Sequence, residues 1–243
     1  MSAYYNEHDK YAAAWLRNLI SAGHIAPGDV DERDIEDVLP DDIKGYTQCH
    51  WFAGIATWSL ALRNAGWPDD RPVWTGSCPC QSFSQAGKGA GFADERHLWP
   101  ALFHHIQHGK PSGVPVFGEQ VASPNGLVWL DLVQNDMEAE GYSFRAVDLC
   151  AAGVGAPHLR QRLFFVADPK RDQQLWKEPC IRKTGRMGWT QQPVPWDRPW
   201  KTALAEIRAM DDGVSRNLGA TDAIRNAIVP RVAEEFIKAV MAG

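Results

Sequence analysis

The sequence of 243 residues lacks the features that mark secreted and membrane proteins. Its five cysteines are an odd number without the spacing of a disulfide framework, which argues against a secreted, disulfide-stabilised domain. No apolar run approaches the roughly 20 residues that a membrane-spanning helix needs. Residues 1–20 also lack the basic-then-apolar form of a signal peptide. We therefore expect a reducing, cytoplasmic setting and no membrane partner.

Two cofactor signatures are missing as well. The histidines at 97, 104, 105 and 108 are not accompanied by paired cysteines or carboxylates at metal-ligand spacing, so we expect no metal. The Gly-x-Gly-x-x-Gly fingerprint of nicotinamide-binding sheets does not follow the apolar segment 46–52. This absence argues against a nicotinamide-dependent oxidoreductase, which is kept as an alternative function.

Charge is unevenly distributed along the chain, although the net charge is only −5. Residues 1–45 hold four Lys/Arg and ten Asp/Glu, whereas residues 158–201 hold ten Lys/Arg and four Asp/Glu. A basic segment of this kind is expected where one face meets phosphates. A solvated surface loop with chance charge explains the pattern about equally well.

Alternating apolar and amphipathic segments predict an α/β fold with one sizeable domain. Helices are expected at 11–20, 58–64, from about 100, at 129–141 and at the chain end, and strands at 46–52, 72–75, 114–121, 143–149 and 163–167. The stretch 168–213 is rich in Trp, Pro, Gln and basic residues and has little periodicity. It predicts a loop-rich surface with aromatic and cationic contacts.

The most informative segment is GSCPCQSF at 76–83, which follows a short apolar run and precedes a Gly-rich stretch at 86–91. This pattern predicts a strand that ends in a loop, where α/β sheets place their chemistry. Cys78 and Cys80 are spaced Cys-x-Cys, which fits neither the Cys-x-x-Cys redox motif nor the usual zinc spacing. A loop cysteine can be a nucleophile as its thiolate, and a buried, inert cysteine is the alternative.

The PCQ core at 79–81 resembles the catalytic loop of DNA (cytosine-5) methyltransferases. Further segments resemble other motifs of that family: an Asp-x-Arg segment at 94–96, VFGEQV at 116–121, PHLRQR at 157–162 and NAIVP at 226–230. Each segment alone has a plausible explanation that involves no function, but the presence of all of them in one chain does not. The resemblance implies a Rossmann-like, S-adenosylmethionine-dependent methyltransferase sheet with a small target-recognition region.

The same resemblance assigns the chemistry to four side chains. Cys80 is the nucleophile that adds to carbon 6 of a cytosine flipped out of double-stranded DNA, and Cys78 is a bystander. Glu119 shares a proton with ring nitrogen 3, while Arg160 and Arg162 orient Glu119 and the base carbonyl. Burying two arginines at the head of an apolar strand without an anionic partner would be costly, which independently favours such a site. The base is expected to contact a further set of loop residues: Pro79, Gln81 and Ser84.

The cofactor, S-adenosylmethionine, is expected at the ends of the first strands. Glu7, directly after one strand, would accept from the ribose hydroxyls, and Asp29, after the next strand, from the adenine amino group. Acidic helix caps would look much the same. The resemblance adds four further cofactor contacts: Phe52, Gly54, Ile55 and Asn226. Where the family has a pair of glycines shortly after the residue that corresponds to Gly54, this chain has Ala56 and Thr57.

The motifs occur in a locally permuted order. Only residues 67–72 separate Gly66 from the next strand, which leaves no room for the two strand-helix units expected there. The segments 6–9 and 28–30 look like those units, placed ahead of the strand at 46–52. We therefore predict that this strand lies between the N-terminal unit and the strand ending near Gly76.

The expected organisation is a catalytic and cofactor-binding core at 1–167, a target-recognition region at 168–213 and a C-terminal segment at 214–243 that returns to the core. A chain this short would suit a phage or restriction-modification context, in a bacterial cell or an infected host. Departures from the family's motifs at Ala56, Thr57, Gln120 and Arg225 leave two alternatives. One is a catalytically silent DNA-binding protein of the same fold. The other is a cytosine-5 modifier that uses a modified cofactor, with an anionic group paired to Arg225.

Overall fold

The computed structural model describes residues 2–79, 98–109, 113–156, 159–169 and 227–242. In chain order the elements are β1 (Ala3–Asn6), α1 (Lys10–Ser21), β2 (Gly28–Asp31), the 3-10 helix η1 (Ile35–Asp37), β3 (Gln48–Trp51), α2 (Thr57–Asn64), β4 (Val73–Gly76), α3 (Trp99–His108), β5 (Val116–Val121), α4 (Pro124–Ala139), β6 (Tyr142–Cys150), the 3-10 helix η3 (Ala151–Val154), β7 (Gln161–Pro169) and α7 (Pro230–Ala242). The predicted α/β class is confirmed.

A seven-stranded sheet in the order β2-β1-β3-β4-β5-β7-β6 organises the described part of the chain. The strands from β2 to β5 are parallel, and β7 and β6 complete the sheet in antiparallel pairing. Strand β3 lies between β1 and β4, so the placement predicted from the permuted motif order is confirmed. The carboxyl ends of the parallel strands meet at one edge, where such sheets bind ligands.

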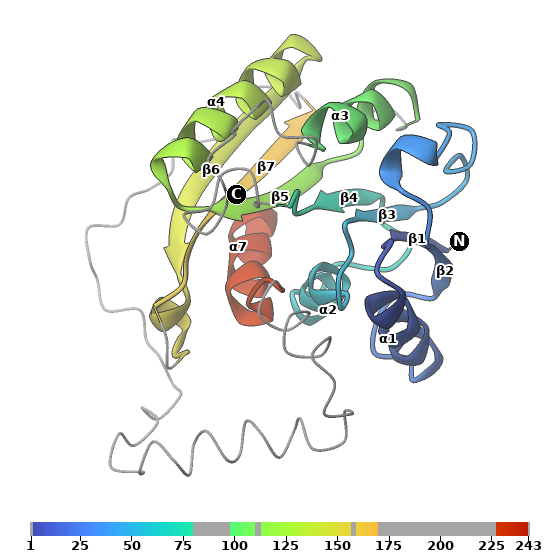
Figure 1. Ribbon diagram of the computed structural model, residues 1–243. Helices are drawn as coiled ribbons and strands as arrows, with labels where there is room; N and C mark the ends of the chain where they lie inside the picture. Colours follow the sequence, from blue (N-terminus) through green and yellow to red (C-terminus); the bar gives the residue numbers. More distant parts are fainter. Residues whose placement is uncertain (1, 80–97, 110–112, 157–158, 170–226, 243) are drawn as a thin grey trace, which may run out of the picture.

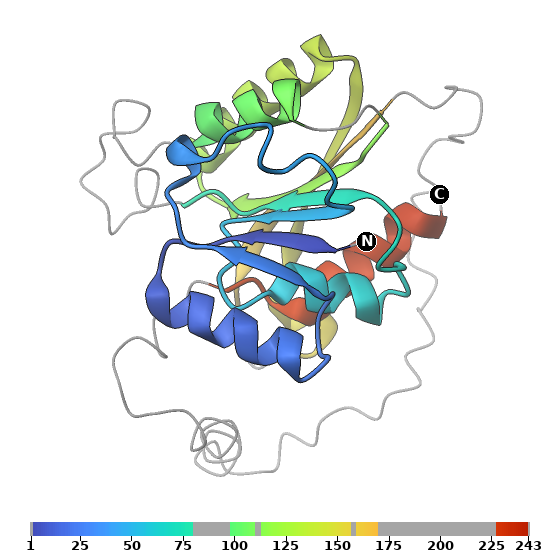
Figure 2. The ribbon, with the colours of Figure 1, turned by 90° about the vertical axis from the view of Figure 1, so that its right-hand side faces the viewer.

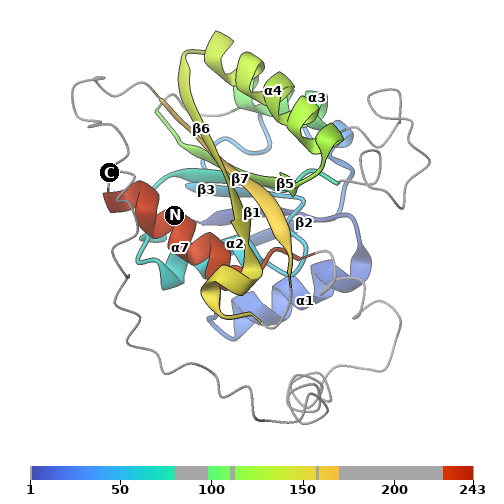
Figure 3. The same ribbon diagram turned by 90° about the vertical axis from the view of Figure 1, so that its left-hand side faces the viewer.

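Helices cover both faces of the sheet (Figures 1 and 2). Helices α3 and α4 lie on one face, and α1, α2 and α7 lie on the other. Figure 3 shows the long strands β6 and β7 running between α4 and α7. Helices α1, α2 and α3 lie in the connections from β1 to β2, from β3 to β4 and from β4 to β5 respectively.

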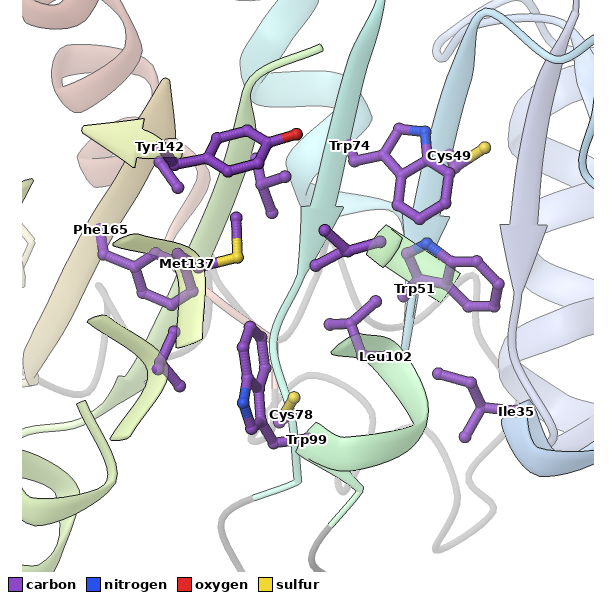
Figure 4. Close-up of a cluster of buried hydrophobic side chains, with 14 of the residues drawn as sticks. Ile35, Cys49, Trp51, Trp74, Cys78, Trp99, Leu102, Met137, Tyr142 and Phe165 are labelled. Atoms are coloured by element: carbon purple, nitrogen blue, oxygen red, sulfur yellow. The ribbon is translucent and has the colours of Figure 1, made fainter. Parts of the chain in front are cut away.

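The core beneath α3 and α4 is rich in aromatic side chains (Figure 4). Trp51 and Trp74 pack at a centroid distance of 5.5 Å, and Trp99 and Trp129 meet edge to face at 5.8 Å. Such pairs add about 0.5–1.5 kcal/mol each beyond the burial of their area. Cys78 belongs to the same cluster and lies beside Trp99.

Two features of the elements differ from the sequence-based expectation. Helix α4 begins at Pro124 rather than near Trp129, because the Ser123 side chain accepts from the Gly126 N–H and proline suits the first helical turn. Asp29 was expected after its strand, but it is the second residue of β2, and Asp31 stands at the strand end. The reason is the pairing of β1 with β2 over the full length of both strands.

No helix within the described ranges is both long and apolar enough to cross a bilayer. No group of three or more His, Cys, Asp or Glu side chains in these ranges is arranged to hold a metal ion.

Candidate active site

Strands β4 and β5 are parallel neighbours, so the segment that leads toward Cys80 leaves the sheet next to the strand that carries Glu119. Gly76, the last residue of β4, pairs with Gly118, so the chain leaves β4 through Ser77 beside Glu119. Gly118 has no side chain because the Phe165 ring crosses it; an added Cβ would meet that ring at 2.1 Å. The loop that leads to the expected nucleophile and the expected acid thus begin at the same edge of the sheet.

Glu119 and Arg162 form a mostly buried ion pair. The Arg162 Nε donates to Glu119 Oε1 at 2.9 Å, and the two side chains are 20% and 8% exposed respectively. Strand β7 brings them together by pairing antiparallel to β5, with Arg162 opposite Val121. Burial raises the pKa of Glu119, and the nearby charges of Arg162 and Arg160 only partly offset that rise. Such a carboxyl holds its proton to higher pH than an ordinary glutamate does.

Arg160 lies just before β7 and turns toward the C-terminal segment. Its Nη2 donates to the Ala227 carbonyl at 2.9 Å, while its buried Nε has no hydrogen-bond partner in the structure. Burial and the neighbouring Arg162 charge lower the pKa of Arg160, and Glu119 acts in the opposite direction. Arg160 also lines the adjoining cavity, so its guanidinium group lies beside a ligand bound there.

Ser77 was not among the predicted site residues. Its Oγ accepts a hydrogen bond from the Trp58 indole Nε1 at 3.0 Å, and Ser77 is one of the groups that lower the pKa of Glu119 against the effect of burial. A serine directly after a strand was the only signal in the sequence, and it did not indicate which partner the hydroxyl would have.

Cys78 lies two residues before the expected nucleophile and faces the core. It is 6% exposed, and burial raises the pKa of its thiol well above the ordinary range. Its thiolate is therefore strongly disfavoured, as expected for a structural cysteine. Pro79, the last described residue of this loop, is half-buried.

A cavity of about 710 Å³ adjoins the ion pair. Its lining comes from the start of α2, the end of β5, the start of β7 and the segment before α7: Ile55, Thr57, Val121, Ala122, Leu159, Arg160, Gln161, Arg162, Ala227, Ile228, Val229 and Pro230. A cavity of this size, mostly apolar with a few convergent polar groups, is typical of a small-molecule site. Ile55 and the two arginines are the predicted site residues that it brings together.

The turn between β3 and α2 is unusual in its backbone. Phe52 and Ala56 both have positive φ angles, of 52° and 63°, and Gly54 between them has a φ of 54°. The left-handed conformation costs a non-glycine residue roughly 1–2 kcal/mol, so surrounding contacts must impose it. One such contact is the Gly54 N–H, which donates to Glu7 Oε2 at 2.7 Å.

Glu7 follows β1 directly, as expected, and its side chain is 11% exposed. Its Oε1 accepts from the backbone N–H of Asp9, and Asp9 itself caps α1. The capping role considered for this acidic segment thus belongs to Asp9. Glu7 instead joins the strand end to the turn at 52–56, which places three predicted cofactor residues, Glu7, Phe52 and Gly54, in one region.

Asp29 lies at a second cavity of about 410 Å³ at the edge of the sheet. Its carboxylate accepts from the Tyr46 hydroxyl at 2.8 Å. Asp31, at the strand end, is bound by Arg33 and by the Tyr4 hydroxyl. Burial raises the pKa of Asp31, but these hydrogen bonds outweigh it and leave the pKa below its usual range.

Several predicted site residues lie outside the described residues. They are the nucleophile Cys80, the base contacts Gln81 and Ser84, and the cofactor contact Asn226. Arg225 and all but the first two residues of the expected target-recognition region, 168–213, are likewise not described.

The sheet order, with its last strand pair antiparallel and a buried acid-arginine pair at its ligand-binding edge, defines a Rossmann-like enzyme fold. The family model of C-5 cytosine-specific DNA methylase matches residues 63–192, more than half of the chain. The chain therefore belongs to the C-5 cytosine-specific DNA methylase family.

The individual proteins that this chain resembles either match over only part of their length or have low sequence identity to it. The chain is 35% identical over 101 residues to the type II methyltransferase M.HhaI of Haemophilus parahaemolyticus, a match that spans 40% of this chain and 30% of that protein. Among solved structures, a Spodoptera frugiperda DNMT2 mutant has a TM-score of 0.46 at 17% identity. The matched region covers 68% of this chain and 42% of the DNMT2 chain. The S. pombe Dnmt2 methyltransferase has a TM-score of 0.45 at 13% identity, and the matched region covers 83% of this chain and 63% of the Dnmt2 chain.

Proposed function

We propose that this protein transfers a methyl group from S-adenosylmethionine to carbon 5 of a cytosine in double-stranded DNA, through a covalent adduct of Cys80. Family membership supports the class of reaction. The observation that carries the proposal is the buried pair of Glu119 and Arg162 beside the loop that leads from β4 to Cys80. No other described acid combines such burial with an arginine on a neighbouring strand.

The residues present fit the cofactor that this reaction needs. The cavity next to the turn at 52–56 offers apolar walls, and the left-handed turn exposes backbone to a ligand that approaches it. Glu7 stands at the strand end beside this turn, where a carboxylate can accept from ribose hydroxyls. S-adenosylmethionine would supply an electrophilic methyl group at this site.

The described side chains have distinct roles in the proposed reaction. The target cytosine must leave the duplex, because its carbon 6 cannot be reached in the stack. Glu119, whose pKa is raised by burial, would share a proton with ring nitrogen 3 while the Cys80 sulfur adds to carbon 6. Arg162 holds the Glu119 carboxyl in place, and the unpaired Arg160 Nε is available to the base carbonyl.

Covalent trapping on DNA tests this proposal. Wild-type protein with S-adenosylmethionine and a duplex containing 5-fluorocytosine should form a stable adduct, because fluorine cannot leave carbon 5 as a proton does. Cys80→Ser should form none. Cys78→Ala is the matched control and should still be trapped, because the Cys78 side chain packs in the core and a small apolar replacement suits it. An adduct that maps to Cys78 would overturn the assignment.

Mass spectrometry of nucleosides from unmodified DNA separates the remaining alternatives. The proposal requires 5-methylcytosine. DNA binding without any product would favour the catalytically silent protein, and a heavier cytosine adduct with a carboxylated cofactor would favour the modified-cofactor reaction. Isothermal titration with S-adenosylmethionine and with NAD distinguishes both from an oxidoreductase.

A further inference from the structure

We propose that Arg160 is a positioning residue that holds the C-terminal segment 227–230 in place, and that this contact shapes one wall of the cavity in which the cofactor binds. The proposal rests on the proposed function, because it takes the cavity of about 710 Å³ as the site of S-adenosylmethionine. It gives a second role to a side chain that the proposed reaction uses toward the base.

The two arginines at the head of β7 have different hydrogen-bond partners. The Arg162 Nε donates to Glu119 Oε1 at 2.9 Å, whereas the Arg160 Nη2 donates to the Ala227 carbonyl at 2.9 Å. A hydrogen bond from a guanidinium group is charge-assisted and stronger than one between neutral groups. The structure thus directs Arg162 to the acid on β5 and Arg160 to the segment before α7.

Arg160 is itself held firmly at its backbone. Its carbonyl accepts from the Ala151 N–H at 3.1 Å, and Ala151 is the fully buried first residue of η3. Strand β7 begins directly after Arg160, at Gln161. The guanidinium group therefore projects from a fixed point, and its bond to Ala227 ties the C-terminal segment to that point.

The segment 227–230 is held at both of its ends. On the side of α7, the Val229 carbonyl accepts from the N–H groups of Val232 and Ala233 at 3.0 and 3.2 Å, and the Ile228 side chain is buried in the same cluster as those of α7. At the other end, the carbonyl of Ala227 accepts from Arg160. Loss of the guanidinium group would leave the contacts on the α7 side and release the Ala227 end.

The position of this segment matters because it lines the cavity. Residues 227–230 all contribute to the lining, and so do Ile55 and Thr57, next to the turn at 52–56. Helices α2 and α7 lie side by side (Figures 1 and 3), so the segments that precede them line the same cavity. A ligand that fits there would have to order a released wall as it binds, at a cost in entropy. Arg160 thus keeps the cavity in its binding-competent shape without having to touch the cofactor.

Cofactor binding without DNA tests the proposal, because a contact of Arg160 with the base cannot then contribute. Isothermal titration of S-adenosylmethionine into the free, full-length protein compares two substitutions. In Arg160→Gln the side chain ends at the chain position of the arginine Nε, too short to reach the Ala227 carbonyl. In Arg160→Lys a charged donor remains on a flexible stem and can still bind that carbonyl. We expect about tenfold weaker binding in Arg160→Gln, and binding within about twofold of the wild type in Arg160→Lys.

Arg231→Met is the matched control for the titration. Arg231 lies in the first turn of α7, is 42% exposed, and pairs with Glu234 and Glu235 of the same helix. Its substitution removes a guanidinium group next to the segment without removing the bond to Ala227. Cofactor affinity should therefore stay close to that of the wild type.

Amide hydrogen exchange measures the anchor itself. The N–H groups of Val232 and Ala233 report on the segment, because both donate to the Val229 carbonyl. In the free protein these amides should exchange faster in Arg160→Gln than in the wild type, and Arg160→Lys should restore the slower exchange. Thermal unfolding shows that each variant is folded. Should Arg160→Gln fail to fold, Arg160→Met, which keeps an apolar stem and no donor, takes its place.

Two results would overturn the proposal. One is a folded Arg160→Gln protein with wild-type affinity for S-adenosylmethionine, and the other is an equal loss of affinity in Arg231→Met, which would indicate a general loosening of α7. A wild-type protein that does not bind S-adenosylmethionine would instead refute the proposed function. The exchange of the Val232 and Ala233 amides would then still decide whether Arg160 holds the segment.

Discussion

Replacing Arg162 with methionine should make the stability of the protein strongly dependent on pH. Methionine keeps an unbranched side chain of similar reach but removes the guanidinium that donates to Glu119 at 2.9 Å. Glu119 would remain buried without its principal counter-charge. The folded state could then avoid an unpaired charge only by keeping Glu119 protonated.

The magnitude follows from the burial of the two partners. Removing one member of a fully buried ion pair costs about 3–5 kcal/mol. Arg162 is 20% exposed and Ser77 and Arg160 still act on Glu119, so we expect about 3 kcal/mol at pH 8. The pKa of Glu119 is already raised in the folded wild type, and loss of Arg162 raises it further. Stability contributed by the bound proton is present at low pH and is lost as pH rises, so the penalty should shrink toward pH 5.

Urea unfolding of wild type and Arg162→Met at half-unit pH steps from 5 to 8 measures this penalty. Glu119→Gln is the matched control, because an uncharged amide removes the titrating group. In the Glu119→Gln background the Arg162→Met penalty should be smaller and nearly independent of pH. A wild-type-like stability of Arg162→Met at pH 8, or a penalty that grows toward pH 5, would refute the interpretation of this pair.

Two further predictions concern packing and the cofactor. Gly118→Ala should lower the free energy of unfolding by about 1–3 kcal/mol, because the added Cβ would overlap the Phe165 ring. Gly153→Ala is the control: the added Cβ meets nothing within 4 Å, so the free energy of unfolding should change by less than about 0.5 kcal/mol. Equal effects of the two substitutions would contradict the packing argument. Glu7→Ala should weaken binding of S-adenosylmethionine by about 1–3 kcal/mol in isothermal titration, through loss of a carboxylate acceptor that also holds the Gly54 N–H, with little change in DNA affinity. Unchanged cofactor affinity would return Glu7 to a purely structural role.

The sequence allowed the sheet to be predicted because its signals are local. Apolar runs and helical periodicity identify β3, β4, β5 and α2 within a few residues of their observed bounds. The position of β3 between β1 and β4 followed from the permuted motif order, because residues 67–72 are too few for the two units that the family places there and segments 6–9 and 28–30 resemble those units. Glu119 was assigned from the resemblance of its segment to a family motif, and the arginine pair also because burying two cations at the head of a strand without an anionic partner is costly.

The remaining features of the site depend on contacts between distant residues. The bond from Arg160 to the Ala227 carbonyl spans 67 positions, and the bond from Gly54 to Glu7 spans 47. No periodicity encodes such pairs. The left-handed Phe52 was equally unpredictable, because intrinsic preference places that conformation at glycine and only the folded surroundings impose it elsewhere.

The strand order has a consequence for synthesis. Strands β1 to β4 pair only with one another, apart from the contact of β4 with β5, so a four-stranded half-sheet is complete once residue 76 has been made. Helix α7 is made last, and its Phe236 packs against Phe117 and Phe164. At about 5–20 residues per second, roughly 8–30 s separate the half-sheet from this helix. Until residues 230–242 have been made, the apolar side chains of α2 and of the sheet that α7 covers lack this partner, so closure of this part of the core must wait for α7.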